Sequence, residues 1–91
     1  MSDVRSCRAT IRRWKPEATG GLAVADLPSE VATALGGLKQ RRVVGTINGA
    51  SFASNVMPAG GGVLALSVSK AMMTAAGASV GDEVELTIEQ G

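Results

Sequence analysis

The chain has 91 residues, of which 45% are hydrophobic, and a formal net charge of +1, which is typical of one small globular domain. It contains no histidine, no tyrosine and a single cysteine, so the commonest general bases, metal ligands and disulfide partners are missing. We therefore expect one domain over residues 1–91, with no catalytic residues, no metal site and no cofactor.

We expect no segment that directs the chain to a membrane or out of the cell. No apolar run approaches the roughly 20 residues of a membrane span, and the first residues lack the apolar core of a signal peptide. These features predict a cytoplasmic protein without membrane contact. Trp14 and Phe52 are the only aromatic residues, which is too few for the stacking platforms that hold single-stranded nucleic acids.

The first elements along the chain are two strands. Residues 4–14 alternate between apolar and polar side chains, with Cys7 and Ile11 on the apolar face, which is the period of a half-buried strand. Residues 17–21 are typical of a turn because they end in two glycines. A short second strand is expected over residues 22–25.

A short helix follows. Leu27-Pro28-Ser29-Glu30 predicts its start, because proline suits the first helical position, where an N–H group is not needed. Val31 and Leu35 lie four residues apart and so share one face. Gly36-Gly37 supplies the left-handed conformation that commonly ends a helix.

The most specific local signal is a hairpin. Residues 41–47 and 50–56 are two apolar-rich runs separated by Asn48-Gly49. An Asn-Gly pair favours the two-residue turn that needs a positive φ at both positions. We therefore expect two antiparallel strands that pair directly.

The last third of the chain predicts a strand, a helix and a strand. Residues 63–68 form an apolar strand, and Ser69 is a good N-cap for a helix over residues 70–76 that ends at Gly77. Residues 83–89 alternate strictly between apolar and mostly acidic side chains, which predicts a final strand with one buried face.

These elements predict a mainly β fold. Six strands in so short a chain would leave exposed edges in an open sheet, and closure into a barrel removes them. We expect a closed six-stranded barrel, similar to a Greek key, with two short helices. We find no internal repeat in the sequence.

The charges are distributed unevenly along the chain. Eight of the nine basic residues lie in the first half, and four acidic residues lie in the last ten positions. A basic half can indicate an anionic partner. Alternatively, the first and last strands lie side by side and pair their charges across the ladder.

Several separated segments together resemble a known family, domain of unknown function 1905, a small bacterial β-barrel domain. The segments are Leu27-Pro28, Arg42-Val-Val-Gly-Thr-Ile-Asn-Gly49, Phe52, Pro58-Ala-Gly-Gly-Gly-Val-Leu-Ala-Leu66, Lys70, Ala75-Ala-Gly77 and Val80-Gly-Asp-Glu-Val84. The resemblance implies a closed Greek-key barrel of six strands with short helices. It also implies a frequent neighbour, a bacteriocin-protection (OmpD-associated) domain, and it implies no catalytic residues.

The chain departs from the family pattern at three positions. The family usually has an aromatic residue near Leu22, a basic or polar residue at Ala53 and an arginine near Met72. The apolar or small residues found here predict a less charged pocket, which weakens the case for an anionic ligand.

We consider first a non-enzymatic module that binds a small molecule or a peptide. Its site would lie in the barrel mouth or in the groove beside the second helix, and the expected ligand-binding residues are Phe52, Ser54, Asn55, Met57, Lys70, Met72 and Met73. The family's usual neighbour suggests antibiotic or bacteriocin sequestration, or self-resistance. We expect a monomer or a weak homodimer.

The alternative is a DNA-binding transcriptional regulator. Val80-Gly-Asp-Glu-Val-Glu-Leu86 is similar to the tail of AbrB-like swapped-hairpin regulators, and the first half of the chain is basic. The sequence pI of about 7.9 argues against this alternative, because a DNA-binding domain usually carries a more basic surface.

Overall fold

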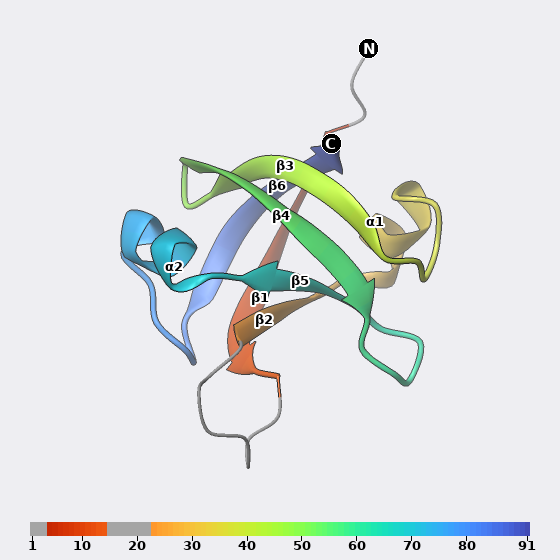
Figure 1. Ribbon diagram of the computed structural model, residues 1–91, viewed down its shortest axis with the longest axis horizontal. Coiled ribbons are helices and arrows are strands. Elements are labelled where there is room, and N and C mark those ends of the chain that lie inside the picture. Colours follow the sequence, from red (N-terminus) through yellow and green to blue (C-terminus); the bar gives the residue numbers. More distant parts are fainter. Residues whose placement is uncertain (1–3, 15–22) are drawn as a thin grey trace.

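The computed structural model describes residues 4–14 and 23–91 (Figure 1). In chain order its elements are β1 (Arg5–Arg13), β2 (Ala23–Leu27), α1 (Ser29–Ala34), β3 (Arg41–Ile47), β4 (Ala50–Pro58), β5 (Leu64–Val68), α2 (Lys70–Ala76) and β6 (Glu83–Gln90). The expected turn over residues 17–21, and Leu22 at the expected start of the second strand, lie outside the described residues.

The six strands form a closed antiparallel barrel in the order β1-β2-β5-β4-β3-β6, and β6 returns to pair with β1. Strands β3, β4 and β5 follow one another as neighbours, and β6 then lies beside β3, which is the Greek-key arrangement. The expectation of a mainly β, closed six-stranded barrel with two short helices is confirmed. Figure 1 shows the helices at opposite sides of the barrel.

The hairpin between β3 and β4 forms at the expected turn. Asn48 has a φ of 49° and Gly49 a φ of 85°, so both central residues adopt the left-handed conformation. The ladder runs without interruption from the Ile47–Ala50 pair to the Arg41–Val56 pair. The turn residues therefore set the register between β3 and β4, which form the longest ladder of any two strands that follow each other in the chain.

The helices form largely where the sequence predicts them. The Ser69 hydroxyl accepts a hydrogen bond from the Met72 N–H at 3.1 Å, and Gly77 ends α2 with a φ of 66°. In α1 the start differs by one residue, because Pro28 is the N-cap and the helix begins at Ser29. Strand β2 correspondingly extends through Leu27, which pairs with Leu64.

The core fills the barrel interior with aliphatic side chains. Alternate residues of each strand point inward, as expected from the period of two in β-structure. The largest fully buried side chains are Ile11, Val24, Leu35, Val43, Ile47, Val56, Leu64, Leu66, Val68, Val84, Leu86 and Ile88. No polar or charged residue is buried among the described residues.

The barrel contains an internal repeat, contrary to the expectation from the sequence. The order strand-strand-helix-strand occurs twice, as β1-β2-α1-β3 and as β4-β5-α2-β6, and exchanging the two halves leaves the ring of strands unchanged. Thr46 pairs with Thr87, which lies 41 positions later, and Ala25 pairs with Leu66 at the same spacing. These two pairs therefore lie on a pseudo-two-fold axis, and the expectation of no repeat is wrong.

The same spacing of 41 positions aligns the helices and the final strands of the two halves. Thr33-Ala34-Leu35-Gly36 corresponds to Thr74-Ala75-Ala76-Gly77, and Val43 through Ile47 corresponds to Val84 through Ile88. Six of these nine aligned positions are identical, and β2 and β5 share one burial pattern. The five aligned positions of β2 and β5, by contrast, share no identical residue, because burial there requires apolar character rather than a particular side chain.

Strands β3 and β6 approach each other closely beside this axis. A Cβ atom on Gly45 would overlap the Thr87 carbonyl oxygen and lie 2.7 Å from its carbon and 3.2 Å from the Ile88 Cα. Only glycine, which has no Cβ, permits this approach. Gly45 therefore lets the two halves of the barrel close together.

Candidate functional site

The residues expected to bind a ligand are spread over several environments. Phe52 and Met72 are buried in the hydrophobic core, with 8% and 7% of their surface exposed. The Ser54 hydroxyl donates a hydrogen bond to the Ser67 carbonyl at 2.6 Å, which joins β4 to β5 where their backbone ladder ends. Phe52 and Met72 therefore pack in the core, and Ser54 holds two neighbouring strands together.

The other predicted residues lie on the outside. Asn55 is exposed on β4, and Met57 on the same strand is half-buried. Lys70 and Met73 come together on α2, where they line a groove of about 270 Å³ with Thr74, Ala78, Ser79 and Val80. The expected groove beside the second helix thus exists, but it holds two of the seven predicted residues.

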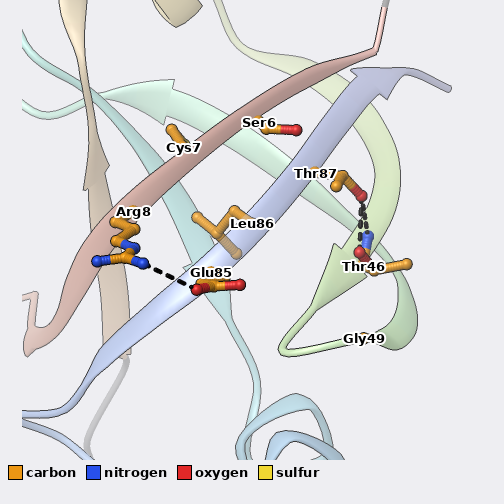
Figure 2. A pocket seen from close by; sticks show the side chains of 8 residues that line it. All are labelled: Ser6, Cys7, Arg8, Thr46, Gly49, Glu85, Leu86 and Thr87. Atoms are coloured by element: carbon orange, nitrogen blue, oxygen red, sulfur yellow. Dashed lines mark hydrogen bonds and ion pairs between the residues drawn. The ribbon is translucent and has the colours of Figure 1, made fainter.

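A larger pocket, of about 470 Å³, lies on β1, β3 and β6, and none of the predicted residues lines it. Figure 2 shows the residues that form it: Ser6, Cys7, Arg8, Thr46, Gly49, Glu85, Leu86 and Thr87. The strict alternation of residues 83–89 indicated which side chains of the last strand point outward. It could not indicate that β1 and β3 flank that strand, because strand order depends on closure of the barrel.

A row of hydroxyl groups crosses the outer face of the barrel at this pocket. Ser6 pairs with Thr87, Thr87 pairs with Thr46, and Thr46 pairs with Ser51, so the row spans β1, β6, β3 and β4. The central Thr46–Thr87 pair lies on the pseudo-two-fold axis. Three of the four hydroxyl residues line the pocket.

The central threonine pair keeps one proton available for a ligand. The Thr87 hydroxyl accepts a hydrogen bond from the Thr46 N–H at 3.0 Å, and the two hydroxyl oxygens lie 2.7 Å apart. The two hydroxyls carry two protons, and the bond between them uses one. Whichever threonine donates, the other O–H remains free to donate.

An ion pair forms the opposite part of the pocket. Arg8 and Glu85 lie directly across the β1–β6 ladder, and an Arg8 Nη donates to a Glu85 carboxylate oxygen at 3.1 Å (Figure 2). Their side chains are 67% and 71% exposed. The expectation that the first and last strands lie side by side with paired charges is confirmed.

A second ion pair lies outside the pocket and has a different geometry. Arg12 donates from Nε and from one Nη to the two carboxylate oxygens of Asp26, at 2.8 and 2.9 Å. The side-chain hydrogen bond to Asp26 raises the pKa of Arg12 above its ordinary value. This two-point contact ties β1 to β2 more firmly than a single exposed contact does.

The lone cysteine lines the pocket without being poised for reaction. Burial raises the pKa of the Cys7 thiol above its ordinary value of 9.0, and the charge of Glu30 adds to this effect. A raised pKa keeps the thiol protonated at neutral pH, and the thiol is a much weaker nucleophile than the thiolate.

The described residues contain neither a cluster of potential metal ligands nor a helix that could cross a membrane. Within residues 4–14 and 23–91, no three histidine, cysteine, aspartate or glutamate side chains gather where they could hold a metal ion. Neither described helix is long and apolar enough to cross a membrane.

The fold and the pocket define a class of protein, the small closed antiparallel β-barrel with a depression on its outer face that carries hydroxyl groups and an ion pair. Comparison with known families then places the chain within this class. It belongs to the family described as Domain of unknown function (DUF1905), whose sequence model matches residues 8–88. The resemblance seen in the sequence is therefore confirmed. No curated protein matches the chain.

Proposed function

We propose that this protein is a non-enzymatic module that binds a small molecule or a short peptide in the pocket formed by β1, β3 and β6. The observation that carries the proposal is the pocket itself. Its volume of about 470 Å³ lies within the range of roughly 300–1,000 Å³ that is usual for ligand sites. Three hydroxyls and one ion pair converge on it, which suits recognition of a polar ligand.

The chemistry of the pocket supports binding rather than catalysis. Cys7 stays protonated, and the pocket residues include neither histidine nor lysine. The acidic residue of the pocket, Glu85, and its basic residue, Arg8, are paired with each other. Such a site offers hydrogen bonds and charge complementarity but no group poised to transfer a proton or attack a substrate.

The biological use that we propose is sequestration of an antibiotic or a bacteriocin-derived peptide, as a form of self-resistance. We further propose a cytoplasmic location, to which the single free thiol of Cys7 is suited. DNA binding, the alternative, would require a continuous basic surface. Two arginines that could contribute to it, Arg8 and Arg12, are paired with carboxylates.

The proposal is tested by titrating the isotopically labelled protein with natural products and short peptides while recording amide chemical shifts. We expect the shifts to change at Thr46, Glu85 and Thr87, and we expect Thr46→Val to weaken binding. Ser51→Ala is the matched control, since Ser51 belongs to the same hydroxyl row but does not line the pocket. Shift changes confined to the groove at Lys70, or none with any compound, would contradict the proposed site.

A further inference from the structure

The pocket carries one more inference, which rests on the proposed function and names its ligand class. We infer that the Arg8–Glu85 pair recognises a small zwitterion, a molecule with an ammonium and a carboxylate group, such as an amino acid or a short peptide with free termini. The ligand carboxylate binds Arg8, and the ligand ammonium binds Glu85. The pocket contains one charge of each sign, so a ligand with one of each matches it without leaving a charge unpaired.

The geometry of the ion pair leaves most of its hydrogen-bonding capacity unused. Arg8 has five N–H donors, of which one is directed to Glu85, and the second carboxylate oxygen of Glu85 has no contact with Arg8. Both side chains are mainly exposed, and exposed single-contact ion pairs contribute little to stability. A zwitterion can therefore exchange this one weak contact for charge-assisted hydrogen bonds to each partner.

The other half of the barrel shows that the fold does not require this ion pair. The pseudo-two-fold axis relates the Arg8–Glu85 pair to the Ala53–Val44 pair, which joins β4 to β3 at the equivalent place. In the β3–β4 ladder, two small apolar residues occupy the place that the charged pair occupies in the β1–β6 ladder, and the strands pair in both. The charges at Arg8 and Glu85 are thus additional to what barrel closure needs, which favours a role in binding.

The hydroxyl groups next to the ion pair complete the recognition of a peptide-like molecule. The Thr46–Thr87 pair holds one O–H that is free to donate, and Ser6 contributes an exposed hydroxyl on the same row. A peptide carbonyl or the second oxygen of a carboxylate accepts such a bond. The volume of about 470 Å³ suits a molecule with the size of a few linked amino acids rather than a folded partner.

The test uses the full chain and a set of dipeptides with neutral side chains. Dialanine is compared with its N-acetyl form, which lacks the ammonium, with its amide, which lacks the free carboxylate, and with the doubly blocked form. We expect dialanine to shift the amides of Arg8 and Glu85. Each single block should weaken binding about tenfold or more, because each removes one charge-assisted hydrogen bond.

Two variants and one matched control assign the charges. Arg8→Gln and Glu85→Gln should each weaken dialanine binding about tenfold, and Arg8→Gln should abolish the discrimination against the amide. Arg12→Gln is the control, because it removes a cross-strand ion pair on the same barrel that lies outside the pocket. Circular dichroism verifies that each variant keeps its fold, and a neutral pocket ligand from the screen above verifies that the pocket remains formed.

The outcomes separate this inference from the proposed function. Doubly blocked dipeptide that binds as tightly as dialanine would overturn the zwitterion assignment while leaving the pocket as a binding site. The zwitterion assignment would also be overturned, and the pocket kept as a binding site, if no dipeptide binds but a neutral compound shifts the amide resonances of Thr46 and Thr87. If no compound of any kind shifts these residues, both the inference and the proposed function fail.

Discussion

The sharpest structural prediction concerns Gly45, because the barrel closes where this residue faces β6. Replacing Gly45 with alanine places a Cβ atom over the Thr87 carbonyl oxygen, 2.7 Å from its carbon. The clash involves backbone rather than the end of a flexible side chain, so β3 and β6 must move apart. That movement disrupts the two hydrogen bonds between Thr46 and Thr87.

The size of the effect follows from these contacts. The two hydrogen bonds contribute about 1 kcal/mol each, and relieving an overpacked contact costs about 1–3 kcal/mol. Alanine recovers about 0.5–1 kcal/mol relative to glycine in a strand, through the smaller entropy of its unfolded chain. We expect a net loss of roughly 3 kcal/mol of unfolding free energy, which corresponds to a fall in Tm of roughly 12–24 °C for a domain of this size.

Thermal and urea unfolding followed by circular dichroism measures this loss. Gly49→Ala is the informative comparison, because no atom lies within 4 Å of its added Cβ and only the positive φ of 85° is unfavourable. We expect Gly49→Ala to cost about 1–2 kcal/mol, which is less than Gly45→Ala. A Gly45→Ala protein as stable as the parent would refute the close approach of β3 and β6.

The remaining predictions concern Asn48, Ser69 and Cys7. Asn48→Ala should lower the unfolding free energy by about 2–3 kcal/mol, because alanine strains the turn and cannot accept from the Glu85 N–H or donate to the Ala76 carbonyl. Asn48→Gly should lower it less, because glycine loses the same hydrogen bonds but adopts the turn without strain. Chemical denaturation of both variants measures the difference. Ser69→Ala should lower unfolding free energy by about 1 kcal/mol through loss of the N-cap, and equal Tm values for variant and parent would contradict this. Cys7 should react with iodoacetamide at pH 8 more slowly than free cysteine does, because its raised pKa leaves less thiolate. The folded state also holds this proton more tightly, so stability should fall as pH rises above about 9.0, and Cys7→Ala should remove that dependence.

Local patterns in the sequence determined the elements and the fold class. The Asn48-Gly49 turn, the Ser69 cap and the alternation of residues 83–89 each depend on neighbouring residues, so their outcome could be predicted from the chain alone. The boundaries at Pro28 and Leu27 shifted by one or two residues, because pairing of Leu27 with Leu64 extended β2 beyond its local signal. The family resemblance agreed with the same barrel.

The predicted binding residues show which spatial relations depend on the tertiary structure. Phe52 and Met72 were expected near a ligand from their residue types, yet their strand and helix faces turn them into the core. Lys70 and Met73 do meet in a groove, because both lie on one short helix and their proximity is a local property. Local spacing can therefore predict neighbours within an element, but not which elements face each other.

The position of the pocket and the two-fold arrangement of the barrel depend on which strands pair. Arg8, Thr46 and Glu85 are far apart in sequence, and closure of the barrel alone brings β1, β6 and β3 side by side. The pseudo-two-fold axis likewise follows from strand pairing, because the pairing of Thr46 with Thr87 and of Ala25 with Leu66 relates the two halves. Local sequence patterns therefore predict a small barrel that lacks histidine and tyrosine, whereas the pairing of distant strands brings the residues of the candidate site together.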